Sequence, residues 1–258
     1  YAWITYDETL IHQEIYKSLK ENRLLGIDMN PNYIGLSIIE FNNNDKFKIL
    51  HKQVFDLTQL TVSSGKASYN KKSKYLTNKL KYETIAIAHE IDRLVNVWKC
   101  KAVSIEDLAI KPKDQKKGKQ LNKLCNNKWE RNLFTNKLKM LANIHRYDIV
   151  EVNPAYSSIV GNIAYGNENT PDMVAASIEI ARRAYKKFEK EWFYPKLNIQ
   201  FLNEQWKQTL GSVENWKELF QQVKKSGMKY RFQLVDYVNN AVFSKIYIKS
   251  KWKLYIFI

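Results

Sequence analysis

Apolar and polar residues alternate from Leu24 to Leu57 in a pattern that predicts three short strands. LLGIDM is an apolar run that ends at an acid, YIGLSIIEF follows the turn residues NPN, and KFKILHKQVFDL follows a run of Asn and Asp. Turns this short can join only neighbouring antiparallel strands, so we expect a three-stranded meander.

Beyond the meander, strands alternate with segments whose apolar residues recur at helical spacing. We expect a helix over about Tyr75–Trp98, a fourth strand at KAVSIEDL, an amphipathic helix late in residues 111–146, a fifth strand at DIVEVN, and a helix starting near Thr170 after a loop over residues 154–169. This order is that of the RNase H-like fold. It predicts an α/β protein with a mixed five-stranded sheet, strands 1-2-3 forming the antiparallel meander, and flanking helices.

The net charge of the chain indicates which class of partner it binds. Lys and Arg number 42 against 26 acidic residues, a net charge of +16, so the protein attracts polyanions, and nucleic acid is the expected partner. No apolar run approaches the roughly 18 residues of a membrane span and no signal peptide is evident, so we expect no membrane partner and a cytoplasmic location. Two cysteines, Cys100 and Cys125, cannot close a zinc site, so no zinc is expected.

Three acids stand where this fold would bring them together. Asp28 ends the first strand, Glu106 ends the fourth, and Asp172 lies in the first turn of the last helix, behind Thr170 as N-cap and Pro171 as first helical residue. Carboxylates are the ligands that Mg²⁺ prefers, and two ions about 3.5–4 Å apart can cleave a phosphodiester. We therefore expect two Mg²⁺ or Mn²⁺ ions at these acids.

Each acid also has an ordinary explanation. An Asp at a strand end is usually a turn former, and capping alone accounts for Asp172. Glu106 is harder to explain in this way, because it stands in the otherwise apolar AVSIEDLAI, where a lone charge is costly to bury. Its neighbour Asp107 is expected on the opposite face, in solvent.

The motifs around these acids resemble a known family. GIDMNPNYIGLSI, SIEDLAI and NPAYSSIVGN followed by TPDMVAASIEIARRA resemble the three RuvC motifs of the transposon-associated TnpB nucleases and of the type V CRISPR effectors. Gly26-Ile27-Asp28, Ile105-Glu106-Asp107-Leu108, Pro154-Ala155-Tyr156-Ser157-Ser158 and Asp172 with Ala175-Ala176 are the matching positions, and the resemblance spans about Leu24 to Arg183. It implies an RNA-guided, metal-dependent DNA endonuclease with Asp28, Glu106 and Asp172 as catalytic metal ligands.

The chain departs from that family at one point. TnpB proteins usually carry a four-cysteine zinc ribbon before the last Asp, whereas the segment between Ser158 and Asp172 contains no cysteine. The resemblance therefore implies a zinc-less variant. From the pattern along the chain we expect three parts: residues 1–23 as a helical lead-in from an upstream region, 24–187 as the nuclease domain, and 188–258 as a C-terminal helical and aromatic extension. The final IYIKSKWKLYIFI is expected to be a buried strand or helix.

A strongly basic segment follows the Glu106 strand. Residues 111–146 hold eleven Lys or Arg against two acids, a local charge of +9, which favours contact with a phosphate backbone at the rim of the acidic centre. Trp129 within it is better explained as core. Arg182 could reach phosphate or could simply be a surface residue. The predicted nucleic-acid contacts are Lys113, Lys116, Lys117, Lys119, Lys123, Lys128, Arg131, Lys137 and Arg182.

Three functions stay open at this stage. The first is the nuclease part of a DNA endonuclease that works with a guide RNA, and the second is a guide-independent RuvC-like resolvase or a transposase. The third is a DNA-binding relative without nuclease activity, which the intact Asp–Glu–Asp set argues against. Ser157 and Ser158 have no evident base partner and the four histidines are scattered, so neither serine nor histidine chemistry is expected.

Overall fold

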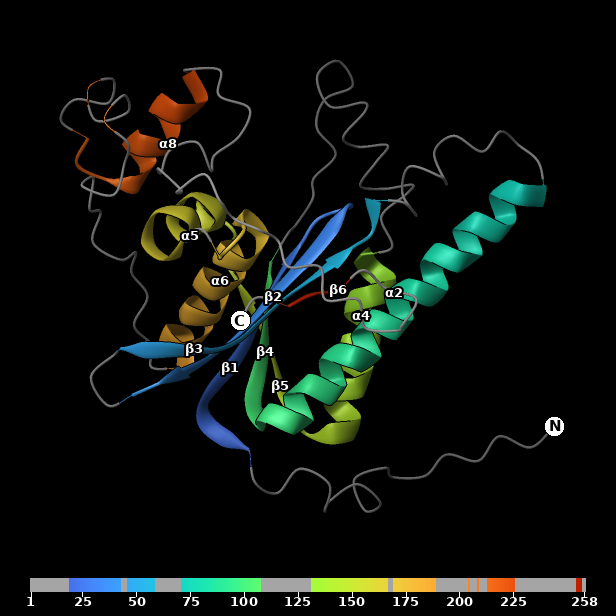
Figure 1. Cartoon of the computed structure of the whole chain (residues 1–258). Coiled ribbons are helices and arrows are strands. Elements are labelled where there is room, and N and C mark those ends of the chain that lie inside the picture. The colour runs from blue at the N-terminus through green and yellow to red at the C-terminus, as the bar shows by residue number, and fades with distance from the viewer. Residues whose placement is uncertain are drawn as a thin grey trace.

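A single mixed sheet lies at the centre of the computed structural model (Figure 1). The structure describes residues 19–42, 46–58, 71–107, 131–166, 169–188, 204, 208, 213–225 and 254–256. Within these ranges the strands are β1 (Lys20–Met29), β2 (Tyr33–Phe41), β3 (Phe47–Asp56), β4 (Cys100–Glu106), β5 (Asp148–Val152) and β6 (Leu254–Ile256), in the sheet order β5-β4-β1-β2-β3-β6.

The predicted meander is confirmed. β1 pairs antiparallel with β2 and β2 antiparallel with β3, while β4 runs parallel to β1 on its other side and β5 parallel to β4. The first turn is set by Asn30, whose Oδ1 accepts hydrogen bonds from the backbone N–H groups of Asn32 (3.2 Å) and Tyr33 (2.9 Å). The order 3-2-1-4-5 with these directions is the RNase H-like arrangement.

Two ends of the sheet differ from the prediction. β1 begins at Lys20, so residues 20–23 belong to a strand and not to a helical lead-in. Arg23 is held there by an ion pair with Glu40 of β2, with 2.9 Å between Nε and Oε1. The sheet also has a sixth strand, because β6 pairs antiparallel with β3; this strand lies in the final segment, which was expected to form a strand or a helix.

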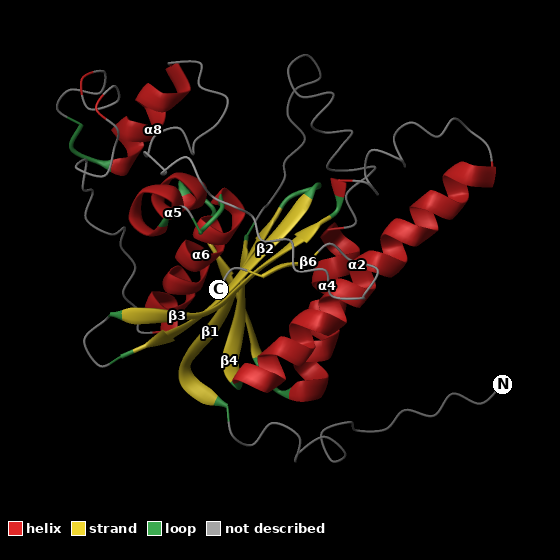
Figure 2. Ribbon diagram, in the orientation of Figure 1, coloured by secondary structure: helices red, strands yellow, loops and turns green. Residues whose placement is uncertain are grey.

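Helices cover both faces of the sheet (Figure 2). α2 (Lys71–Trp98) and α4 (Arg131–His145) lie on one face, and α5 (Ser157–Tyr165) and α6 (Asp172–Phe188) lie on the other, with α8 (Trp216–Lys225) beyond α5. Each face has its own apolar core. Leu25, Ile27 and Val103 belong to the cluster that includes residues of α2 and α4, whereas Leu24 and Ala102 belong to the cluster with α6.

Helix α5 corrects a second prediction. The sequence was expected to form a loop over residues 154–169, but Ser157–Tyr165 are helical. The helix follows Tyr156 in a left-handed conformation (φ 63°) and has no side-chain cap, so it lacks the usual start signal. Among the described helices, none combines the length and the apolar character that a membrane span requires.

Candidate active site

Asp28 and Glu106 face the same side of the sheet. Successive side chains in a strand point to opposite faces, and the even-numbered Leu24 and Ala102 pack in the core that includes α6. By the same alternation Asp28 and Glu106 point toward the α6 side, while Asp107 is exposed, as expected. The two acids therefore share one face.

They also lie at the same end of it. β1 and β4 are parallel, and Gly26 pairs with Ser104. Asp28 and Glu106 each lie two residues further along, at the carboxyl ends of these adjacent strands. Their side chains differ in exposure, because Glu106 is buried (7% exposed) and Asp28 is only partly buried.

Helix α6 brings Asp172 to this corner. Asp28 pairs with Gly35 across β1 and β2, and a Cβ on Gly35 would lie 2.5 Å from the backbone oxygen of Met173. Only glycine lets the first turn of α6 come this close to the sheet. Asp172, which precedes Met173, is thus held beside the strand end that carries Asp28.

The start of α6 differs slightly from the prediction. The backbone oxygen of Pro171 accepts a hydrogen bond from Ala175 N (2.9 Å), so the helix begins at Asp172, one residue after the predicted first position. The Oγ1 of Thr170, the predicted cap, accepts a hydrogen bond from Lys52 Nζ at 3.1 Å. A carboxylate in the first helical turn still suits the helix dipole.

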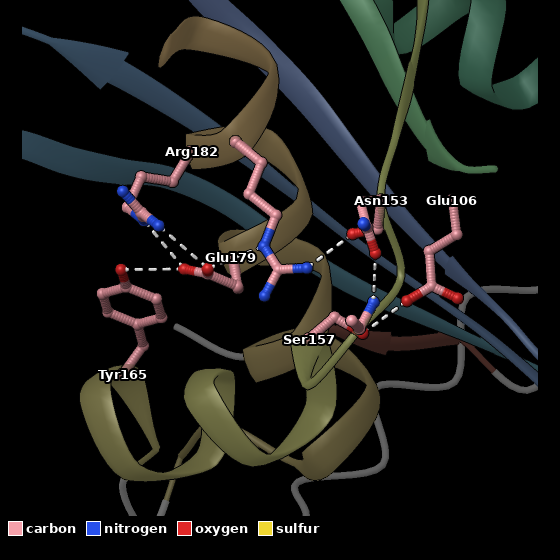
Figure 3. A network of polar contacts seen from close by, with 8 residues as sticks. Glu106, Asn153, Ser157, Tyr165, Glu179 and Arg182 are labelled. Atoms are coloured by element: carbon pink, nitrogen blue, oxygen red, sulfur yellow. Dashed lines mark hydrogen bonds and ion pairs between the residues drawn. The ribbon is translucent and has the colours of Figure 1, made fainter. Parts of the chain in front are cut away.

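Two side chains of α5 engage these acids, and sequence reasoning missed both. Ser157 Oγ donates a hydrogen bond to Glu106 Oε1 (Figure 3). Asn162 Nδ2 donates to Asp172 Oδ1 and, at 2.8 Å, to the backbone oxygen of Ser158. The available signal was the presence of Ser and Asn within the otherwise apolar stretch SSIVGNIAY.

Asp28, Glu106 and Asp172, the predicted metal ligands, do not form a metal-binding cluster in this structure. Within the described ranges, no three His, Cys, Asp or Glu side chains lie close enough together to hold a metal ion. Glu106 and Asp172 are instead engaged by α5. The residue types nevertheless suit a hard divalent cation, since carboxylate oxygens are the ligands it prefers and Asp28 and Asp172 are partly exposed. A shared metal centre stays a prediction.

A buried ionic cluster lies behind this corner (Figure 3). Glu179 on α6 is fully buried and accepts hydrogen bonds from Arg182 Nε (2.8 Å), Arg183 Nε (2.8 Å) and Tyr165 OH (3.2 Å). Burial first, and then the charge of Glu179, raise the pKa of Tyr165 well above its ordinary value. Arg183 Nη1 donates to the backbone oxygen of Asn153 at 2.5 Å.

This cluster changes the interpretation of Arg182. Its side chain is buried (7% exposed) and Nη2 also donates to Glu179, at 2.9 Å, so it is not an ordinary surface residue. A phosphate contact by Arg182 has no support from these contacts and stays a prediction.

Part of the basic segment is described. Arg131, the first residue of α4, donates from Nη2 to the backbone oxygen of Glu106 at 3.2 Å, and Lys137 is partly buried on the same helix. The chain thus leaves the site after Asp107 and is back beside Glu106 at Arg131. Trp129 and the predicted contacts Lys113, Lys116, Lys117, Lys119, Lys123 and Lys128 lie outside the described residues.

Comparisons with known proteins give only distant structural likenesses. No family profile matches the chain, and no curated protein matches it. RuvC of Thermus thermophilus, solved with a Holliday junction substrate, is 12% identical with a TM-score of 0.40, over 65% of this chain and 96% of that one. The Fowlpox virus resolvase, solved with Holliday junction DNA, is 12% identical with a TM-score of 0.38, over 64% of this chain and 98% of that one.

A third likeness comes from another kind of enzyme. The Ppx/GppA phosphatase of Aquifex aeolicus is 13% identical with a TM-score of 0.32, over 55% of this chain and 39% of that one. All three TM-scores lie below 0.5, so these likenesses establish neither a family nor an activity. The chain is assigned an RNase H-like fold on its own strand order and register.

Proposed function

We propose that this protein is a divalent-metal-dependent DNA endonuclease whose centre is formed by Asp28, Glu106 and Asp172. The observation that supports this most is their common placement: two acids at the carboxyl ends of adjacent parallel strands, and a third at the start of the helix packed on Gly35 beside them. The nuclease domain would comprise residues 20–187, and β6 of the C-terminal segment would add a strand at the edge of its sheet.

In this proposal the three carboxylates hold two Mg²⁺ or Mn²⁺ ions. Bound ions would supply an activated water and would stabilise the leaving oxygen of the phosphodiester. Glu106 is the most buried of the three acids, and a bound cation would compensate its buried charge in addition to the hydrogen bond from Ser157.

Substrate binding is proposed to fall to the basic segment, residues 111–146. Asp107, the last described residue before this segment, directly follows Glu106, and Arg131, the first described residue within the segment, contacts the backbone oxygen of Glu106. Cations here would hold phosphates that the carboxylates repel. The proposed guide RNA has narrower support, namely the three RuvC-type motifs in order, while a guide-independent resolvase remains the second candidate.

The test compares two neighbouring acids. Glu106→Gln is expected to abolish Mg²⁺-dependent cleavage in single-turnover assays, whereas Asp107→Asn, an equivalent change at an exposed acid, should cleave like the wild type. Wild-type cleavage by Glu106→Gln, or no cleavage by the wild type on any DNA, contradicts the proposal.

The choice of substrate and of RNA separates the candidates. Linear duplex, single-stranded and four-way-junction DNA should be compared with and without the nucleic acid that co-purifies with the full-length protein. Cleavage that depends on a discrete RNA supports the guided enzyme. Symmetric cutting of junctions without RNA supports the resolvase, and DNA binding without cleavage supports the inactive relative.

A further inference from the structure

Helix α5 runs between two of the three carboxylates. Its first residue, Ser157, donates to Glu106, and Asn162, five residues later, donates to Asp172. Both donors are buried, with Ser157 3% exposed and Asn162 0% exposed. A buried polar side chain is retained at a cost unless it has hydrogen-bond partners, and here the partners are the acids of the candidate centre.

The helix is fixed on both sides. A Cβ on Gly161 would lie 2.4 Å from the backbone oxygen of Ala175, so the backbones of α5 and α6 are in direct contact. On its other side Ile159 and Ile163 pack in a cluster with Trp216 of α8. The position of the two donors is therefore set by packing, and neither depends on a mobile side chain.

Hydrogen bonds of Asn153 also fix the turn before α5 (Figure 3). Asn153 Oδ1 accepts a hydrogen bond from Ala155 N at 2.8 Å, and its backbone oxygen accepts one from Arg183, which is itself bound to Glu179. The contacts thus extend from the buried ionic cluster, through the turn, to Ser157 at the start of the helix. The fully buried Arg183 thus links Glu179 to the turn that precedes α5.

We propose that Ser157 and Asn162 are positioning residues that orient the Glu106 and Asp172 carboxylates for divalent metal ions, with α5 as the common support. This inference rests on the proposed function. A donor that occupies one oxygen of a carboxylate fixes its rotation and leaves its remaining lone pairs for a cation. Removing such outer partners weakens metal binding by about 10- to 100-fold in metalloproteins.

The experiment measures Mn²⁺ binding to the full-length protein by calorimetry, without DNA. Ser157→Ala should bind Mn²⁺ about 10-fold more weakly or worse, and Ser157→Thr, which keeps the hydroxyl, should restore most of the affinity. Ser177→Ala is the matched control, since Ser177 is also a buried serine but its hydroxyl donates to Ser37 Oγ at 2.9 Å and not to one of the three acids. Its Mn²⁺ affinity should equal that of the wild type.

The outcomes separate the two proposals. If the wild type binds Mn²⁺ and Ser157→Ala binds it equally well, the positioning role is wrong and the metal centre stands. If Ser177→Ala weakens Mn²⁺ binding as much as Ser157→Ala does, the loss reflects general destabilisation, and the positioning role is again wrong. If the wild type binds no Mn²⁺, the metal centre fails and the positioning role fails with it. Asn162→Ala should repeat the Ser157→Ala result at Asp172, and the Ser157 variants decide the matter if it does not fold.

Discussion

Asp28 lies directly opposite Gly35 in the β1–β2 pair, and at Gly35 the first turn of α6 comes into backbone contact with the sheet. The missing side chain at Gly35 lets the backbone of Met173 approach, which places Asp172 beside Asp28. An acid 144 positions later in the chain thus reaches the same corner because of a glycine in a neighbouring strand.

The first prediction concerns Asp28. Asp28→Ala should reduce Mg²⁺-dependent cleavage by about 100-fold or more, because one of the three carboxylates proposed to hold the metal ions is gone. Binding of nucleic acid should stay intact or become tighter, since a like charge facing phosphate is removed. Single-turnover cleavage and equilibrium binding on the same variant check both halves. Cleavage at the wild-type rate contradicts the assignment.

The second prediction is that substitutions in the basic segment reduce nucleic-acid binding, in contrast to Asp28→Ala. Replacing Lys116, Lys117 and Lys119 by Ala is expected to weaken binding and to flatten its salt dependence. Each lost phosphate contact should remove about 0.7–0.9 from the slope of log affinity against log salt. Binding titrations at several salt concentrations measure this slope. An unchanged slope means that these lysines do not contact phosphate.

The buried ionic cluster predicts a large stability difference between two similar ion pairs. Glu179 and Arg182 form an i,i+3 pair that is almost fully buried, whereas Glu90 and Arg93 form an i,i+3 pair near the surface, with Arg93 57% exposed. Glu179→Gln should lower the free energy of unfolding by about 3–5 kcal/mol, because two buried guanidinium groups lose their anion.

Glu90→Gln is the control for that change and should cost about 0–1 kcal/mol. Urea denaturation of both variants, at neutral pH and fixed salt, gives the comparison. Equal losses in the two variants would mean that burial does not set the strength of the Glu179 cluster.

Cys100 predicts a pH dependence of stability. Burial raises the pKa of its thiol from 9.0 to about 12, so the folded state holds the proton more tightly than the unfolded state. This contribution is present in full below about pH 9 and is lost as pH rises toward 12. From pH 8 to pH 10.5 the stability of the wild type relative to Cys100→Ala should fall by about 2 kcal/mol. If the stability difference between the wild type and Cys100→Ala stays constant over this pH range, the prediction is wrong.

The sequence was most informative where local pattern and tertiary structure agree. The meander follows from alternation and short turns, and the β1–β4 pairing follows from the parallel connection through α2. Helix α5 could not be found in this way. Six of its nine residues are buried, so it shows no polar face, and Pro154, Gly161 and Gly166 suggested a loop.

The three acids of the site could be predicted from the sequence, but the side chains that contact them could not. The strand ends and the helix start can be located locally, so Asp28, Glu106 and Asp172 could be named. Their neighbours depend on how α5 packs on α6, and this is set by Gly161 against the backbone of Ala175. For the same reason the burial of Arg182 was not predicted, because two adjacent arginines on a helix give no sign of a buried carboxylate one turn earlier.

The most direct test of the central claim is a crystal structure of the full chain grown or soaked with Mn²⁺, with the ion located by its anomalous scattering. We expect Mn²⁺ at the carboxyl ends of β1 and β4, within coordination distance of the Asp28, Glu106 and Asp172 carboxylates. Mn²⁺ bound elsewhere, or a site that engages none of these three acids, would contradict it.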